Sequence, residues 1–257
     1  MLRNLEIVRA LGRKVQDNRL EIRLTQQDRE RAARLLARIP ASTAIVAVGI
    51  GAGSASRRWP LECYAKTLTR LTKERRVQAV ILCSPSERKE ARKLAQLLLH
   101  EPIIVSSDHL REACAVLERC HLFIGNDSGC AHLAAAMRCK TIVISRHPSN
   151  GDPNHRNSPV RFAPWCECVQ VLQPARGLGP CKTACLSLEP HCITAVPVEE
   201  VVATAKEMLA RDLGRIDTVM LAPYNDDSLA GSKSIAAALK EAPELPGIGR
   251  SRPEELT

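Results

Sequence analysis

Aromatic residues are scarce in this chain of 257 residues, which has only two Trp, two Tyr and two Phe. Proteins that bind single-stranded nucleic acid by base stacking need aromatic side chains, so the composition disfavours this class. The hydrophobic core must be built from Leu, Ile, Val and Ala instead. Such a composition favours helices packed on a parallel β-sheet over an all-β sandwich.

The sequence also lacks long apolar runs and an export signal. No stretch reaches the roughly 18 apolar residues expected of a membrane-spanning helix. The start, MLRNLEIVRALGRK, has neither an apolar segment nor a cleavage site of the secretory kind. A cytoplasmic protein is therefore expected, and its eleven cysteines are expected to be reduced thiols. Because eleven is odd, they cannot all be paired within the chain.

Positive charge is in excess, with 37 Lys and Arg against 28 Asp and Glu and a formal charge of +9. A basic protein attracts anionic partners, which include nucleic acids, anionic membrane surfaces and phosphorylated small molecules. A solvated surface rich in arginine would give the same balance. The sequence has no helix-turn-helix, zinc-finger or RNA-recognition pattern, so no nucleic-acid partner is predicted.

Short β-branched runs alternate with helical patterns along most of the chain. Thr25 and Asp28 form a capping-box pattern that predicts the start of the first clear helix. Strands followed by helices at this spacing predict right-handed βαβ units and an α/β fold with a parallel sheet covered on both faces. Strands are predicted at 43–49, 77–83, 102–105, 121–125 and 140–145, and helices at 25–39, 60–74, 85–99, 108–119, 128–138 and 197–211.

Three segments are expected along the chain. Residues 1–40 hold a stretch without a clear period and one helix. Residues 41–212 hold the alternating strands and helices, with an irregular stretch at 146–196 that is rich in Pro, Cys, Asn and Gly. Residues 213–257 contain Gly, Ser, Pro and acidic residues, a composition that predicts a flexible tail.

The first candidate site is the loop GIGAGSASRRWP at 49–60, between a predicted strand and a predicted helix. Small residues such as Gly53 let the backbone approach a ligand, and the N-terminus of a helix favours anions. Arg57 and Arg58 could add charge-assisted hydrogen bonds to phosphate oxygens. The glycine spacing matches neither the dinucleotide-binding pattern nor a P-loop, so a tight turn with two surface arginines explains the loop equally well.

A second candidate site lies where the strand at 121–125 runs into a helix. Asn126, Asp127, Ser128 and Gly129 crowd the start of this helix, and His132 follows on the same helical face. These groups either cap the helix or form a polar cradle for a sugar or phosphate. The combination DSGxxH at a strand-to-helix turn is more specific than any one of its members.

Glu87 is a third candidate, just after the strand predicted at 77–83. An acidic residue at such a strand end can hold a ribose diol in nucleotide-binding sheets. The alternative is a glutamate in the first turn of a helix, where the helix dipole stabilises its charge. Position alone favours the second interpretation.

Several cysteines are close together in the irregular stretch, with His191 beside the last of them. Cys and His are the usual ligands of tetrahedral zinc and iron sites, but the spacing is not that of a standard zinc knuckle. A loop of reduced thiols is the preferred interpretation, so neither a metal nor a cofactor is predicted. The cysteines concerned are Cys166, Cys168, Cys181, Cys185 and Cys192.

Taken together, these segments resemble the heptosyltransferase family, glycosyltransferase family 9. RRWPLECYAKTL at 57–68 resembles a family stretch with a basic residue before Trp-Pro. LCSPSERKEARKLA at 82–95 resembles a strand end followed by an acidic residue, and CHLFIGNDSGCAHLAAAMRCKTIVIS at 120–145 resembles the signature around Asn-Asp-Ser-Gly. The cysteines at 181–192 resemble the family's closing Cys stretch. The resemblance covers residues 40–210, with three motifs in order.

This resemblance implies a GT-B fold, in which two Rossmann-like domains face a cleft and the second binds a nucleotide sugar, typically ADP-heptose. By motif, Arg57 corresponds to a basic residue that contacts the diphosphate, and Glu87 to the acid that holds the ribose. Asp127, Ser128 and Gly129 correspond to the segment beside the sugar and pyrophosphate, with His132 in the same turn.

The resemblance also implies an activity: inverting transfer of a sugar, heptose, to a lipopolysaccharide core or related glycan, with peripheral contact at the inner face of the cytoplasmic membrane. The family's catalytic base lies in an N-terminal acceptor domain. Residues 1–40 resemble only the end of that domain, so no residue is assigned as the base and a separate N-terminal half is an expected partner. The alternatives are a non-catalytic nucleotide-sugar-binding module, truncated or half of a split enzyme, and another GT-B enzyme such as a nucleotide-sugar epimerase.

Overall fold

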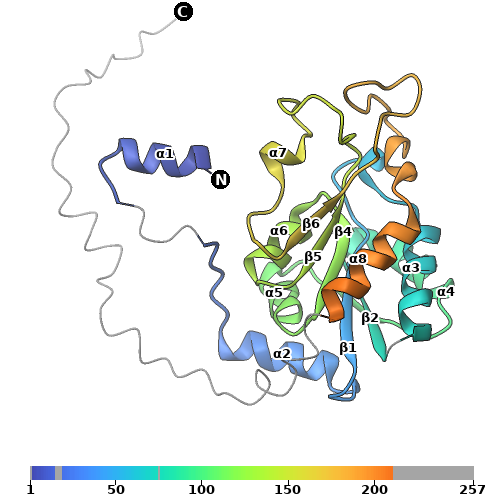
Figure 1. Cartoon of the computed structure of the whole chain (residues 1–257). Helices are drawn as coiled ribbons and strands as arrows, with labels where there is room; N and C mark the ends of the chain where they lie inside the picture. Colours follow the sequence, from blue (N-terminus) through green and yellow to red (C-terminus); the bar gives the residue numbers. More distant parts are fainter. Residues whose placement is uncertain (1, 15–18, 75, 211–257) are drawn as a thin grey trace, which may run out of the picture. The chain divides into compact units, whose positions relative to one another are not determined.

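The computed structural model describes residues 2–14, 19–74 and 76–210 (Figure 1). The tail predicted at 213–257 lies outside the described residues. The helices are α1 (Leu2–Ala10), α2 (Gln26–Leu36), α3 (Leu61–Glu74), α4 (Arg88–Gln96), α5 (Leu110–Glu118), α6 (Gly129–Ala136), α7 (Pro159–Phe162) and α8 (Val198–Ala210). The strands are β1 (Ala44–Gly49), β2 (Val77–Cys83), β3 (Ile103–Ser106), β4 (Leu122–Asn126), β5 (Thr141–Ile144) and β6 (Val169–Leu172), and short 3-10 helices are η1 (Ala55–Arg57), η2 (Pro85–Glu87) and η3 (Cys192–Ala195).

The six strands form one parallel sheet in the order β3-β2-β1-β4-β5-β6. The predicted α/β fold is therefore confirmed. The chain adds strands outward from β1 in one direction and then returns to add β4 on the other side, so the direction of winding reverses between β1 and β4. In open sheets of this kind, ligands bind beyond the carboxyl ends of the strands at such a reversal. Gly49 and Gly125 are paired there.

Apolar side chains cover both faces of the sheet. Along β1, Val46 and Val48 point into one core, while Ile45 and Ala47 point into the other. The first core also contains buried residues of α3, α4 and α8, and the second those of α2, α5 and α6. This double coverage explains why the strands are almost continuously apolar. No helix in the described ranges combines the length and the apolarity that a membrane crossing requires.

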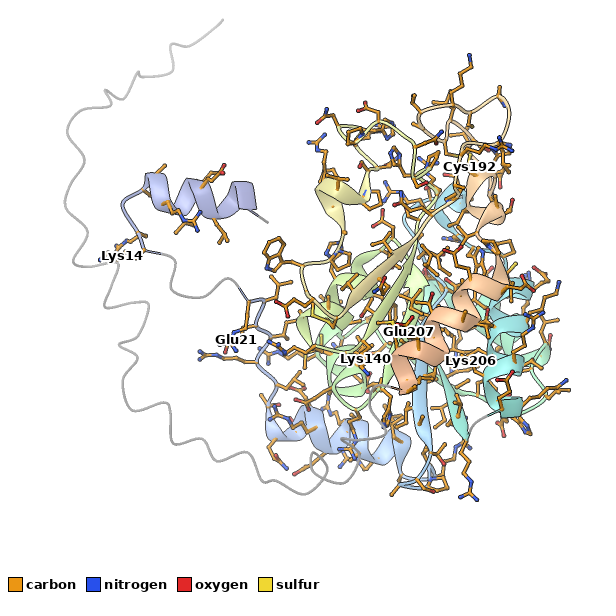
Figure 2. All side chains as sticks on the ribbon, viewed as in Figure 1. Lys14, Glu21, Lys140, Cys192, Lys206 and Glu207 are labelled. Carbon is orange, nitrogen blue, oxygen red and sulfur yellow. A yellow bond between two sulfur atoms is a disulfide. The ribbon has the colours of Figure 1, made fainter. Side chains whose placement is uncertain are left out.

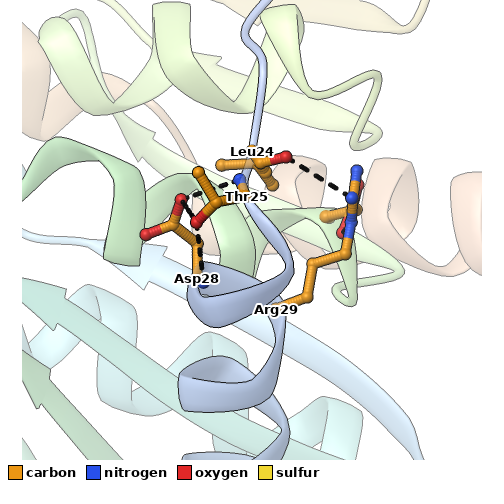
Figure 3. A network of polar contacts seen from close by, with 5 residues as sticks. Leu24, Thr25, Asp28 and Arg29 are labelled. Atoms are coloured by element: carbon orange, nitrogen blue, oxygen red, sulfur yellow. Dashed lines mark hydrogen bonds and ion pairs between the residues drawn. The ribbon is translucent and has the colours of Figure 1, made fainter.

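Helix α2 begins at the capping box that the sequence predicts (Figure 3). The Asp28 carboxylate accepts hydrogen bonds from the Thr25 backbone N–H at 2.9 Å and from the Thr25 hydroxyl at 2.6 Å. The Thr25 hydroxyl oxygen in turn accepts the Asp28 N–H at 3.2 Å. These bonds lower the pKa of Asp28, with the hydroxyl of Thr25 the largest cause. The next residue, Arg29, forms an ion pair at 3.0 Å with Glu118 of α5, which joins α2 to α5.

Helix α8 is attached to the sheet and to α3 by polar groups around its carboxyl end (Figure 2). The Nζ of Lys140, just before β5, donates a hydrogen bond of 2.5 Å to the Met208 carbonyl. Lys206 forms an ion pair with Glu74 of α3. A cation at the carboxyl end of a helix is favourable because the last carbonyl groups there lack partners within the helix.

The prediction of an irregular stretch at 146–196 is wrong in part, because the structure contains β6 paired in parallel with β5. Strand β6 has only four residues, of which Leu172 alone is buried. A short edge strand with one buried side chain lacks the apolar run by which the other strands are recognised. The stretch also contains α7 and η3. The helix predicted at 85–99 begins instead as η2 and continues as α4.

Candidate functional site

The candidate site lies beyond the carboxyl ends of β1 and β4, where the winding of the sheet reverses. The loop after β1 contains η1 and leads into α3, and the turn after β4 leads into α6. Added Cβ atoms at Gly53 and Gly129 would meet nothing within 4 Å, so the backbone at both positions borders open space. A ligand could therefore approach the main chain of both loops closely.

Asn126 holds the loop after β1 in place. Its side chain is fully buried, and its Oδ1 accepts hydrogen bonds from the Trp59 backbone N–H at 2.9 Å and from the Tyr64 hydroxyl at 3.0 Å. Its Nδ2 donates to the carbonyl oxygens of Ile50 at 2.9 Å and Gly51 at 3.3 Å. The amide is thus fully used within the protein. The sequence groups Asn126 with the ligand-binding residues. In the structure, its side chain holds the loop after β1 in position.

The two adjacent arginines have different surroundings. Arg58 donates from Nη2 to the Ala52 carbonyl at 3.2 Å, so it braces its own loop. Arg57, the last residue of η1, donates from Nη2 to Oδ1 of the buried Asn157 at 3.0 Å. A guanidinium group has five N–H donors, so this bond leaves most of Arg57's donors for other partners.

Arg57 lines a cavity of about 410 Å³. The charged residues in the described lining are all basic: Arg57, Arg146 and Arg156, with His155 beside them. Arg146 follows β5 and donates from Nη1 to the Ser56 hydroxyl at 2.5 Å and to the Ser187 carbonyl at 3.1 Å. A concave site with several guanidinium groups and no carboxylate in its described lining favours an anionic ligand. The cavity is lined by Ser54, Ser56, Arg57, Arg146, His155, Arg156, Asn157, Cys185, Leu186, Ser187 and Leu188.

Asp127 lies near these cations but is not part of the described lining of the cavity. Burial raises the pKa of its carboxyl group, and the positive charges of Arg57, His132 and Arg146 partly oppose this rise. The hydroxyl of Ser128 is buried without a hydrogen-bond partner at the start of α6, where it makes no capping bond. His132 is exposed. Asp127, Ser128 and His132 thus form a second polar group beside the arginine-lined cavity.

The raised pKa of Asp127 leads to a prediction about stability. The folded state binds the proton more tightly than the unfolded chain, so ionisation destabilises the fold as the pH rises above the ordinary value of 3.8 and through the folded value. We expect Asp127→Asn to raise the melting temperature at pH 7, and the difference from the wild type to vanish at acidic pH. Thermal denaturation between pH 3 and pH 8 measures both effects.

Asp28→Asn is the matched control, because the pKa of Asp28 is lowered. An acid of this kind stabilises the fold above its unfolded pKa and loses that contribution as the pH falls. Asp28→Asn should therefore lower the melting temperature at pH 7. If both variants moved the melting temperature in the same direction, the environment described for Asp127 would be wrong.

Glu87 lies against the loop after β1 and also caps the next helix. Its Oε2 accepts hydrogen bonds from the backbone N–H and the hydroxyl of Ser84, both at 2.9 Å, in a capping box. Its Oε1 occupies the space beside Gly51, where an added Cβ would come within 2.0 Å of it. One carboxylate oxygen of Glu87 therefore caps the helix, and the other faces the loop after β1.

Sequence reasoning missed Arg146, His155, Arg156 and Asn157 as site residues. For Arg146 a signal exists, because it follows the strand predicted at 140–145 and the carboxyl ends of parallel strands share one edge of the sheet. The other three belong to the segment between β5 and β6, whose return to the cavity depends on tertiary packing.

The cysteines of the same region separate into two groups. Cys166 and Cys168 form a disulfide, so the prediction of reduced thiols is wrong for this pair. Their Cα atoms are 5.1 Å apart, within the range that a disulfide requires. Cys181, Cys185 and Cys192 remain thiols and pack together, with His191 beside them.

Comparison with known proteins gives three consistent results. Residues 3–184 match the family model for glycosyltransferase family 9 (heptosyltransferase). A curated relative is lipooligosaccharide heptosyltransferase 2 of Campylobacter jejuni, 25% identical over 170 residues that make up 63% of this chain and 49% of that protein. The chain thus spans about half the length of the curated relative that it matches.

Solved structures show the same fold. The family 9 glycosyl transferase of Veillonella parvula superposes with a TM-score of 0.66 at 18% identity, covering 80% of this chain and 58% of the other. The ADP-heptose lipopolysaccharide heptosyltransferase II of E. coli superposes with a TM-score of 0.58 at 15% identity, covering 75% and 54%.

Proposed function

This chain belongs to glycosyltransferase family 9, the heptosyltransferases, and from that membership we propose that residues 41–212 bind a nucleoside-diphosphate sugar such as ADP-heptose. The sugar would pass, with inversion, to a lipopolysaccharide core or a related glycan. Peripheral contact with the inner face of the cytoplasmic membrane, where such an acceptor is anchored, is part of this proposal. The basic charge of the chain supports an encounter with anionic lipid and glycan.

The observation that carries the proposal is the arginine-lined cavity beside the reversal between β1 and β4. When a sugar leaves a nucleoside diphosphate, negative charge grows on the departing phosphate oxygens. Arg57 and Arg146 are held by hydrogen bonds to Asn157, Ser56 and Ser187, so they are oriented before a ligand arrives. Fixed positive groups directed at developing charge stabilise a transition state without reorganisation.

Asp127 and Ser128 fit the sugar side of the same site. Ser128 has a buried hydroxyl without a partner, which suits a hydrogen bond to a ligand oxygen. The carboxyl group of Asp127, near Arg57, can accept a hydrogen bond from a sugar hydroxyl. We propose no base among the residues of this chain; the proton of the acceptor hydroxyl would be removed by a group of the acceptor-binding half.

Calorimetric titration with ADP and UDP tests the donor site. We expect saturable binding of ADP, weakened roughly 10- to 100-fold in Arg57→Ala because charge-assisted hydrogen bonds to phosphate are lost. Arg38→Ala is the matched control, since Arg38 is exposed just beyond the end of α2 and should leave the affinity unchanged. A folded chain that binds neither nucleotide, or equal affinities in Arg57→Ala and the wild type, would contradict the proposal.

A second candidate is a non-catalytic nucleotide-sugar-binding module. It differs from the first candidate in needing no base, and none is proposed among the residues of this chain. Both candidates predict ADP binding, so a transfer assay separates them. Transfer of heptose from ADP-heptose to an acceptor glycan in the presence of the acceptor-binding half would support the enzyme, and ADP binding without any transfer under the same conditions would support the non-catalytic module. Transfer that requires a second polypeptide would support one half of a split enzyme.

A further inference from the structure

Four side chains with metal-binding atoms converge in the loop between β6 and α8. They are Cys181, Cys185, His191 and Cys192, and their ligand atoms all lie within 4.8 Å of one another. The three cysteines are buried and the histidine is half-buried. Figure 2 shows Cys192 before the start of α8, at the opposite end of this helix from Lys206. The cluster is therefore distant from the polar groups at the carboxyl end of α8.

We propose that Cys181, Cys185, His191 and Cys192 bind one zinc ion in a tetrahedral Cys3His site. Zinc binds Cys sulfur at about 2.3 Å and His nitrogen at about 2.0–2.1 Å, so neighbouring ligand atoms in a tetrahedron are roughly 3.6 Å apart. The Nδ1 of His191 lies 3.6 Å from the Sγ of Cys181 and 3.5 Å from the Sγ of Cys192. These separations suit ligands that share one ion.

The surroundings of the four side chains also suit a metal. The three cysteines form a cluster separate from the two main cores of the sheet, in a loop whose regular structure among the described residues is η3. A loop with little secondary structure gains order from a structural metal site. The backbone N–H of Leu186 donates to the Sγ of Cys181 at 3.4 Å, the kind of contact that stabilises a thiolate ligand.

The proposed zinc site would shape one wall of the arginine-lined cavity. Cys185 lines that cavity, and so do Leu186, Ser187 and Leu188, which lie between the second and third ligands. The Ser187 carbonyl accepts a hydrogen bond from Arg146 at 3.1 Å. Fixing Cys185 and His191 on one ion fixes the segment between them. The zinc would thus act as a structural brace for the site rather than as a participant in chemistry.

Metal analysis of the full chain, purified under reducing conditions without a chelator, tests the proposal. We expect about one zinc ion per chain. Cys192→Ser should lower zinc affinity by at least about 100-fold, more than the loss of an outer contact to a ligand would cause. Cys63→Ser is the matched control, because Cys63 is a half-buried thiol on α3, and it should keep the zinc.

Cobalt substitution keeps the test decisive if Cys192→Ser fails to fold. Wild-type protein loaded with Co²⁺ should show the strong visible absorption of tetrahedral cobalt together with thiolate charge-transfer bands, and added zinc should abolish both. Iron in place of zinc, a disulfide among the three cysteines, or a folded chain that stays metal-free in the presence of zinc would each overturn the assignment. None of these readouts depends on nucleotide binding, so the result stands apart from that of the proposed donor site.

Discussion

Asn126→Ala is expected to lower the free energy of unfolding by roughly 3–5 kcal/mol, because each buried polar group left without a partner costs about 1–3 kcal/mol. The truncation removes four hydrogen bonds at once and leaves the N–H of Trp59 and the carbonyl of Ile50 without their side-chain partner. Urea denaturation monitored by circular dichroism measures the loss. The same variant should weaken ADP binding, since the loop that carries Arg57 would no longer be held.

Two controls separate the role of the amide from a general effect of truncation. Tyr64→Phe removes one of the four bonds, together with the longer contact of 3.3 Å from the same hydroxyl to the Gly49 carbonyl, and should cost about 1 kcal/mol. Asn150→Ala, at an exposed position, should stay within about 0.5 kcal/mol of the wild type. If Asn126→Ala cost no more than Tyr64→Phe, the network around Asn126 would not hold the loop.

Phe123→Ala is expected to cost about 3–5 kcal/mol, the range for truncating a large side chain in a closed core. Phe123 is fully buried in β4, and its ring fills the space beside two glycines. An added Cβ at Gly49 would lie 2.7 Å from the ring, and one at Gly125 would lie 2.6 Å from it. The ring therefore packs against β1 and β4 at the point where the winding of the sheet reverses. Thermal and urea denaturation measure the effect.

The chain contains a matched control, since its only other phenylalanine is Phe162. That residue is 46% exposed at the end of α7, with the Arg161 guanidinium 5.1 Å from its ring centre. Phe162→Ala should cost no more than about 1 kcal/mol. A comparable loss of unfolding free energy in both variants would argue against this packing role of Phe123.

Much of the sheet follows from local sequence. The strand predicted at 77–83 coincides with β2, and the four other predicted strands agree with β1, β3, β4 and β5 within one residue at each end. Buried parallel strands are short apolar runs between helices, so the signal is strong. Strand β6 has a single buried side chain and gives no such signal.

The candidate site could be located from sequence more readily than its residues could be assigned. The edge of the sheet follows from the strand ends, which places Arg57, Glu87 and Asp127 on one side of the fold. The Asn126 amide forms its hydrogen bonds with Ile50, Trp59 and Tyr64. These residues are distant in sequence, so the local pattern around Asn126 does not reveal its role.

The cysteine cluster illustrates the same limit. The spacing of Cys181, Cys185, His191 and Cys192 matches no standard knuckle, and only the folded loop brings their ligand atoms together. The pairing of Cys166 with Cys168 likewise has no signal in the sequence, because the lack of an export signal favours reduced thiols.

Arg146 has a further consequence for the energetics of ligand binding. It joins the loop after β1, through Ser56, to the loop before α8, through Ser187, so two walls of the cavity share one guanidinium group. Loops that are already immobile lose little conformational entropy when a ligand arrives, and affinity gains from this preorganisation. Nucleotide association should then be a single-step encounter without a slow closing phase, and its heat should come mainly from contacts with the phosphates.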